Sequence, residues 1–108
     1  MKRTILRAAR VALLMGSIAA AHAEQADGLT LAQRKNCMAC HAVNKPLMGP
    51  SFHDIAARYA ARADAGDYLA QTIVKGSVGV WGNVPMPANT QLTGTEAHAL
   101  AHWVLSVR

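Results

Sequence analysis

Apolar and polar residues recur at helical spacing in several stretches of the chain. A first helix is predicted over about residues 27–36. Asp27 or Thr30 is its expected N-cap, because short polar side chains accept hydrogen bonds from the free amides of a first turn. A second helix is predicted over about residues 51–60. Its apolar side chains share one face, which we expect to be buried: Phe52, Ile55 and Tyr59.

The second half of the chain predicts two further helices. One covers about residues 67–75, with Asp67 as its N-cap and Gly76 at its end. The other has the clearest start, because Thr93 and Glu96 have the spacing of a capping box. The apolar side chains that these helices turn inward are Leu69 and Ile73 in one, and Leu100, Val104 and Val107 in the other.

Residues 76–91, between these two helices, have the composition of an ordered loop. Turn-forming residues recur there at Gly76, Gly79, Gly82, Pro85 and Pro87. No stretch of the chain alternates with period two for long enough to predict a sheet. We therefore predict an all-α fold of about four short helices, in which this long loop has a functional role.

The size of the chain limits its core. It has 108 residues, enough for one small domain, with 52% apolar but only 5% aromatic residues. A domain this small usually needs disulfides, a metal or another staple, yet only two cysteines are present. A large buried cofactor would complete such a core.

Residues 1–23 have the pattern of an export signal. A positively charged segment, residues 1–10, precedes the apolar residues 11–20 and small residues at the two positions that a signal peptidase reads. The apolar run would rise about 16 Å as a helix, too short for a hydrocarbon core of about 30 Å. No Arg-Arg pair is present, so a Sec-type signal is favoured. We expect cleavage after Ala23, leaving a domain over residues 24–108 in the periplasm.

The charge of the chain is concentrated in that first segment. It holds four of the eleven basic residues and none of the six acidic ones, which leaves a net charge of +1 on the remainder. This balance argues against a basic nucleic-acid-binding face.

The run Cys37-Met38-Ala39-Cys40-His41 is the most informative motif. In an exported protein, Cys-x-x-Cys-His is typical of covalent haem attachment, with two thiols for the vinyl groups and an imidazole as the proximal iron ligand. Three alternatives remain. A disulfide would close a strained loop, a thioredoxin-like pair needs a βαβ frame, and a zinc site needs two further ligands.

Met86 is the expected second axial ligand of such an iron. It lies 46 residues beyond Cys40, far enough for the chain to reach the other face of the cofactor. Flanking prolines stiffen the backbone in Val84-Pro85-Met86-Pro87. The alternative is that Met86 only fills a gap in the core.

Five motifs together resemble the short bacterial class I cytochromes c of the cytochrome c-551 type. The resemblance covers essentially all of residues 27–108. Its motifs are Cys-Met-Ala-Cys-His at 37–41, Met-Gly-Pro-Ser-Phe at 48–52, Lys-Gly-Ser-Val-Gly-Val-Trp-Gly at 75–82, Pro-Met-Pro-Ala-Asn at 85–89 and a closing helix ending in His-Trp-Val-Leu-Ser. It implies a cytochrome c fold wrapped around one covalently bound haem c.

The resemblance also implies a role for individual residues. Cys37 and Cys40 would form the thioethers, and His41 and Met86 would be the axial ligands. Around them, the Pro50 carbonyl would accept the His41 Nδ1–H, Trp81 would reach a haem propionate and Asn89 would lie near the Met86 sulfur. Asn36 departs from the pattern, since relatives usually have Gly before the first cysteine. Asn tolerates left-handed backbone angles better than most residues, so the turn remains compatible.

The implied function is one-electron transfer rather than enzymatic catalysis, because both axial positions are occupied. The implied partners are redox proteins: a quinol-oxidising cytochrome complex as donor, and a nitrite reductase, an oxidase or a peroxidase as acceptor. We expect a monomer that binds no nucleic acid and does not insert stably into a membrane. One alternative is a haem-based sensor or peroxidase-like enzyme with a labile Met86. Another is a thiol–disulfide oxidoreductase with free thiols.

Other residues permit two interpretations. His98 and His102 could share a metal but lack a third ligand, so we expect them to face solvent. Trp103 is expected in the core. Five basic residues could steer an acidic partner to the haem edge or form an ordinary solvated surface: Arg34, Lys35, Lys45, Arg58 and Arg62.

Overall fold

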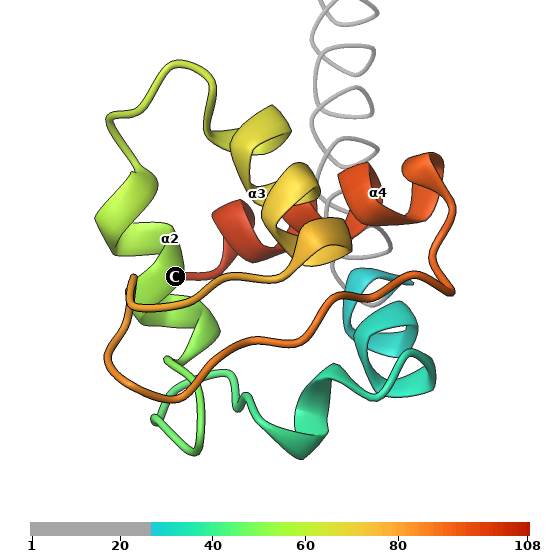
Figure 1. Ribbon diagram of the computed structural model, residues 1–108. Helices are drawn as coiled ribbons and strands as arrows, with labels where there is room; N and C mark the ends of the chain where they lie inside the picture. Colours follow the sequence, from blue (N-terminus) through green and yellow to red (C-terminus); the bar gives the residue numbers. More distant parts are fainter. Residues whose placement is uncertain (1–26) are drawn as a thin grey trace, which may run out of the picture.

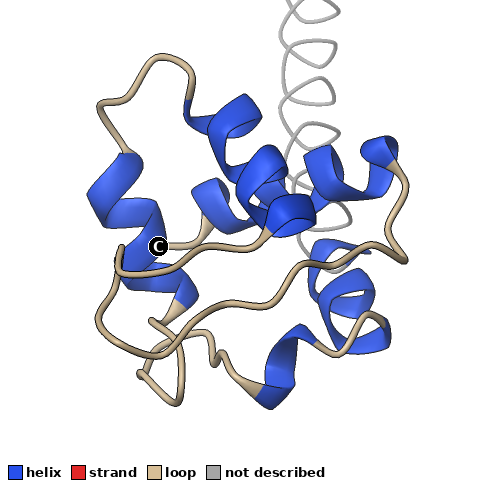
Figure 2. Cartoon of the chain, viewed as in Figure 1, coloured by secondary structure: helices blue, strands red, loops and turns tan. Residues whose placement is uncertain are grey.

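The computed structural model describes residues 27–108, which form helices and loops with two isolated β-bridges and no β-strand. The expectations for residues 1–23 lie outside this part. Figures 1 and 2 show short helices joined by long loops. In chain order the elements are the helical residues 27–34, the 3-10 turn η1 (Cys37–Ala39), α2 (Phe52–Tyr59), α3 (Ala65–Lys75) and α4 (Gly94–Ser106). The predicted all-α architecture is confirmed.

Helix α2 forms where the sequence predicts it. The Ser51 hydroxyl accepts a hydrogen bond from the Asp54 amide at 3.0 Å. This N-cap satisfies an amide that the first turn leaves free, so the helix begins directly after the Pro50–Ser51 pair. The predicted apolar face of Phe52, Ile55 and Tyr59 is buried.

Helix α3 begins earlier than predicted, because Asp64 and not Asp67 occupies the N-cap position. Asp64 makes no side-chain cap and instead pairs with Arg62, with Nε 2.6 Å from Oδ1. Both aspartates suit a helix start, and burial of Ala65 in the core favours the earlier one. The predicted end is confirmed: Gly76 follows the last turn with a φ of 76°, which suits glycine.

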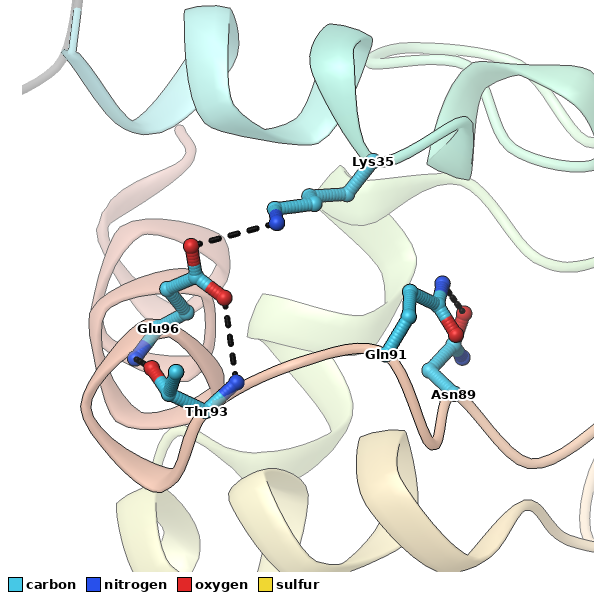
Figure 3. Close-up of polar contacts among 5 residues, drawn as sticks. All are labelled: Lys35, Asn89, Gln91, Thr93 and Glu96. Carbon is cyan, nitrogen blue, oxygen red and sulfur yellow. Dashed lines mark hydrogen bonds and ion pairs between the residues drawn. The ribbon is translucent and has the colours of Figure 1, made fainter.

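Helix α4 starts with the predicted capping box (Figure 3). Glu96 N donates to Thr93 Oγ1 at 3.1 Å, and Thr93 N donates to Glu96 Oε2 at 3.0 Å. The second carboxylate oxygen of Glu96 lies 3.2 Å from Lys35 Nζ. These contacts lower the pKa of the Glu96 carboxyl, the Thr93 backbone amide having the largest effect. The cap therefore also joins α4 to the chain that follows the first helical residues.

Residues 27–34 are helical, so Thr30 lies inside the helix and its predicted role as N-cap is wrong. Asp27 is the first residue that the structure describes, so its role as N-cap stays a prediction. Gly28 lies against α4, because a Cβ at this position would overlap the Trp103 side chain. The helix approaches α4 there more closely than any other residue would allow.

The core lies where α4 packs against α2 and α3. Trp103 is only 7% exposed and meets Phe52 edge to face, with ring centroids 4.9 Å apart. The prediction that Trp103 belongs to the core is confirmed. These packed helices form one wall of a cavity.

Candidate functional site

A largely apolar cavity of about 280 Å³ opens between the helices and the loop that follows α3. The two segments predicted to bind the cofactor both line it. We call residues 36–52 the cysteine segment and residues 76–91 the methionine loop. Figure 1 shows the methionine loop running from α3 toward α2 and back toward α4. The predicted site residues that line the cavity are Cys37, Cys40, His41, Pro50, Trp81, Met86 and Asn89.

Both thiols of the cysteine segment are free and partly buried. The turn before them starts at Asn36, whose φ of 63° is the left-handed angle expected there. Backbone hydrogen bonds to the Cys37 carbonyl, from Cys40 N at 3.2 Å and His41 N at 3.1 Å, shape the turn. Burial raises the pKa of the Cys37 thiol. Reactive thiols in redox pairs have a lowered pKa, so this environment does not resemble theirs.

His41 is buried and held on three sides. Its Nδ1 lies 2.7 Å from the Pro50 carbonyl oxygen, the contact that the resemblance implies. Its ring stacks on Phe52 at a centroid distance of 5.1 Å. A Cβ on Gly49 would lie 2.7 Å from His41 Cε1, so only glycine leaves room for the ring. With Nδ1–H donated to Pro50, Nε2 carries the lone pair that a metal would use.

The methionine loop is pinned at its base beside α3. Ser77 and Met86 exchange two backbone hydrogen bonds, at 3.0 and 2.9 Å. The backbone passes so close that a Cβ on Gly76 would lie 2.5 Å from the Met86 carbonyl oxygen. Asn89 adds a second attachment, since its amide Nδ2 donates to the Ile73 carbonyl at 3.0 Å. Met86 is thus held at a defined place in the cavity wall.

Trp81 and Asn89 make contacts that the sequence does not predict. Asn89 also donates to Pro87 O at 3.4 Å, so its side chain braces the methionine loop. It also accepts from Gln91 Nε2 at 3.3 Å (Figure 3). Trp81 is 40% exposed, and the guanidinium of Arg58 covers its ring at 4.3 Å.

Sequence reasoning missed Tyr68 and Thr72, which also line the cavity from α3. Tyr68 stands 5.3 Å from Tyr59 between ring centroids, and Thr72 donates to the Tyr68 carbonyl at 2.9 Å. Their spacing of four places both on one face of α3. This spacing was the signal available in the sequence. The polar groups of Tyr68 and Thr72 did not suggest that these residues would line a cofactor cavity.

Three of the five basic residues considered for steering are engaged within the molecule. Lys35 pairs with Glu96, Arg62 with Asp64, and Arg58 contacts the methionine loop. They are therefore part of the folded framework as well as of the surface.

His98 and His102 are exposed, as predicted. His98 Nδ1 lies 2.8 Å from the Gly94 carbonyl and Nε2 lies 3.2 Å from Asp67 Oδ1. Among residues 27–108, no three His, Cys, Asp or Glu side chains are grouped to hold a metal ion.

Within residues 27–108, no helix has the length and apolar character needed to cross a membrane.

The donor set fits a covalently attached haem. Two thiols, one oriented imidazole and one thioether line a single apolar cavity in a small all-α domain. These are the groups that c-type haem attachment and His/Met ligation require. Fold and site therefore define a small protein built around one haem.

Comparisons with known proteins identify the family. The cytochrome c family model matches residues 25–108, and the chain belongs to the cytochrome c family. Cytochrome c-552 of Nitrosomonas europaea is 45% identical over 97 residues, which cover 90% of this chain and 88% of that protein. Cytochrome c-551 of Pseudomonas aeruginosa is 45% identical over 94 residues, covering 87% and 89%.

The fold is also found in a solved relative. The crystal structure of wild-type cytochrome c552 from Nitrosomonas europaea superposes with a TM-score of 0.73 at 48% identity, covering 74% of this chain and 99% of that one. Proteins of the family bind one covalent haem c with iron and are electron-transfer proteins rather than enzymes. The family and the class I cytochrome c fold inferred from the motifs are confirmed.

Proposed function

We propose that this chain is a periplasmic one-electron carrier in which Cys37 and Cys40 attach haem c and His41 and Met86 ligate its iron. The observation that carries the proposal is the convergence of these four side chains on one apolar cavity. When bound, the haem supplies an iron that alternates between ferric and ferrous. The residues of the chain attach it, hold its ligands and exclude water.

His41 and Met86 have separate tasks in this proposal. The Pro50 carbonyl orients the His41 ring and keeps Nε2 free for iron. The Met86 thioether favours reduced iron and raises the reduction potential. Rigid ligands limit rearrangement on electron transfer. In the same proposal the Trp81 indole reaches a haem propionate, and Asn89 supports Met86 by bracing the methionine loop.

An exposed apolar surface suits brief docking of a redox partner. Met48 and Val84 line the cavity yet are 63% and 60% exposed. Leu47 and Val78 are also exposed. A small apolar patch without strong net charge favours weak, transient complexes. We propose a quinol-oxidising cytochrome complex as donor and a nitrite reductase, an oxidase or a peroxidase as acceptor, with the carrier acting as a monomer.

Location in the periplasm is proposed from the sequence alone. Residues 1–23 would direct export and be removed after Ala23, leaving residues 24–108 as the mature domain. Cell fractionation and the intact mass of the purified protein test this. The mass should equal residues 24–108 plus one haem. A mass that retains residues 1–23 would contradict cleavage.

The Met86 assignment is tested by its own variant. Met86→Ala should open the sixth coordination position: the ferrous protein binds carbon monoxide, the ferric methionine-to-iron charge-transfer band is lost, and the reduction potential falls. Met48→Ala is the matched control, because Met48 lines the same cavity but is not a proposed ligand. The assignment is wrong if Met86→Ala leaves all three properties unchanged. Rapid carbon monoxide binding by the unmodified ferrous protein would instead favour the sensor or peroxidase-like alternative.

A further inference from the structure

The outer part of the methionine loop is attached to α2 by one arginine. Arg58 Nη1 donates to the Val80 carbonyl at 2.9 Å, although the two residues are 22 positions apart. The same guanidinium lies 4.3 Å from the Trp81 ring centroid and 5.7 Å from that of Tyr59. Tyr59 and Trp81 also meet edge to face, at 6.5 Å. Arg58 therefore contacts two successive residues of the loop through two kinds of interaction.

These contacts hold the part of the loop that its base does not reach. Ser77 and Met86 close the base, and the chain between them extends outward, with Val78 78% and Val84 60% exposed. An exposed loop of this length opens readily unless contacts from another element hold it. Val80 belongs to this outer part of the loop, and it lines the cavity together with Met86.

We propose that Arg58 is a positioning residue for Met86. By holding Val80 and Trp81 against α2, it keeps the methionine loop closed and determines how often the thioether leaves the iron. This inference rests on the proposed function, in which Met86 is the axial ligand. It adds a residue that does not line the cavity and acts through the loop.

The chemistry of the guanidinium explains why an arginine serves here. Its planar, delocalised cation can donate an N–H in its own plane to a carbonyl while its face stacks on an indole. The compact ammonium of lysine can satisfy the carbonyl but does not stack in the same way. We therefore expect Arg58→Lys to retain part of the effect and Arg58→Gln to lose it.

The test measures imidazole binding to the ferric holoprotein by stopped flow. Imidazole enters only after Met86 leaves, so its limiting binding rate reports loop opening. Arg58→Gln should raise this rate about tenfold, the change expected from losing contacts worth a small part of total stability. Arg58→Lys should fall between Arg58→Gln and the unmodified protein. Hydrogen exchange of the amides of residues 78–84 should accelerate in the same order.

Arg62→Gln is the matched control. Arg62 also stacks on a tyrosine, Tyr68 at 3.7 Å, and also forms hydrogen bonds, but its bonds are to Asp64 outside the methionine loop. This variant should leave the imidazole rate within about twofold. Denaturant unfolding of each variant separates a change in global stability from a change in loop opening.

The outcomes separate this inference from the proposed function. If Met86→Ala exposes the iron but Arg58→Gln and Arg62→Gln bind imidazole at the same rate, the positioning role is wrong and the ligand assignment stands. If Met86→Ala changes neither imidazole binding nor the charge-transfer band, the ligand assignment itself fails. A rate increase in Arg58→Gln that is matched by an equal loss of global stability would also overturn the positioning role.

Discussion

The cysteine segment and the methionine loop line one cavity but are held in place differently. His41 Nδ1 is hydrogen-bonded to the Pro50 carbonyl, nine residues away, and the ring packs against Gly49 and Phe52. The support of His41 is therefore local and buried. Met86 depends on contacts with α3 at its base and with Arg58 on α2 farther out. Local, buried contacts open rarely, whereas exposed contacts between distant residues open first. The comparison indicates that opening of the methionine loop, and not displacement of His41, is the low-energy motion of this protein.

The largest expected effect distinguishes two glycines within the methionine loop. Gly76→Ala should destabilise the protein by at least about 2 kcal/mol, because it combines a positive φ with a clash against the Met86 carbonyl. Gly79→Ala is the control: its φ of 80° is equally left-handed, but no atom lies near its Cβ, so about 1 kcal/mol is expected. Denaturant unfolding of the holoproteins measures both. Equal losses of unfolding free energy in the two variants would show that the base of the loop can shift to accommodate the added Cβ.

Asn36 tests the cysteine segment in the same way. Asn36→Ala should cost about 1 kcal/mol, because alanine adopts the left-handed angle of φ 63° less readily than asparagine. Asn36→Gly should remain within about 0.5 kcal/mol of the unmodified protein, since glycine takes this angle freely but loses more entropy on folding. Thermal unfolding of the three proteins compares them. A neutral Asn36→Ala would show that the left-handed angle at this turn does not limit stability.

A third variant removes the support where the methionine loop passes into α4. Thr93→Ala should lower the free energy of unfolding by about 1 kcal/mol, because the N-cap of the capping box is lost. Thr95→Ala, in the exposed first turn of the same helix, should change it by less than about 0.5 kcal/mol. Urea unfolding measures both. Similar changes in the two variants would show that the cap is not what anchors this end of the loop.

The smallest effect concerns the helices on either side of the methionine loop. His98 of α4 forms hydrogen bonds with the Gly94 carbonyl and with Asp67 of α3. These contacts raise the pKa of His98 above its ordinary value of 6.5, and the Gly94 carbonyl has the larger effect. The protonated form is thus favoured in the folded state. Its stabilisation is complete below pH 6.5 and is lost as the pH rises through the higher folded pKa.

Unfolding at pH 5 and pH 9 tests this contribution. His98→Gln should be less stable than the unmodified protein at pH 5 and closer to it at pH 9. The interpretation fails if the His98→Gln difference is larger at pH 9. Because the pair is exposed, the effect is expected to be small.

Sequence reasoning succeeded where local chemistry determines structure. The start of α2 near Ser51, the capping box of Thr93 and Glu96 and the end of α3 at Gly76 each depend on neighbouring residues alone, and each is present as predicted. The Thr30 cap of the first helix and the start of α3 were mispredicted. In both places several residues suit an N-cap, and in α3 the burial of Ala65 in the core favours the earlier start.

The site was predictable to the same extent. The donor residues stand out in the sequence because their chemistry is unusual. The residues that support them from other elements do not, since the contact of Arg58 with Val80, or of Asn89 with Ile73, joins positions far apart in the chain. Such pairings depend on the path of the methionine loop, which neither periodicity nor composition describes.

The most direct test of the central claim is the proton NMR spectrum of the ferrous holoprotein. A methionine bound to haem iron has its methyl group directly over the porphyrin ring, whose ring current shifts that resonance far upfield. We predict one such methyl signal, present in the unmodified protein and in Met48→Ala and absent in Met86→Ala. The absence of any upfield methionine methyl signal, or its persistence in Met86→Ala, would contradict the proposed arrangement of His41 and Met86 around one haem.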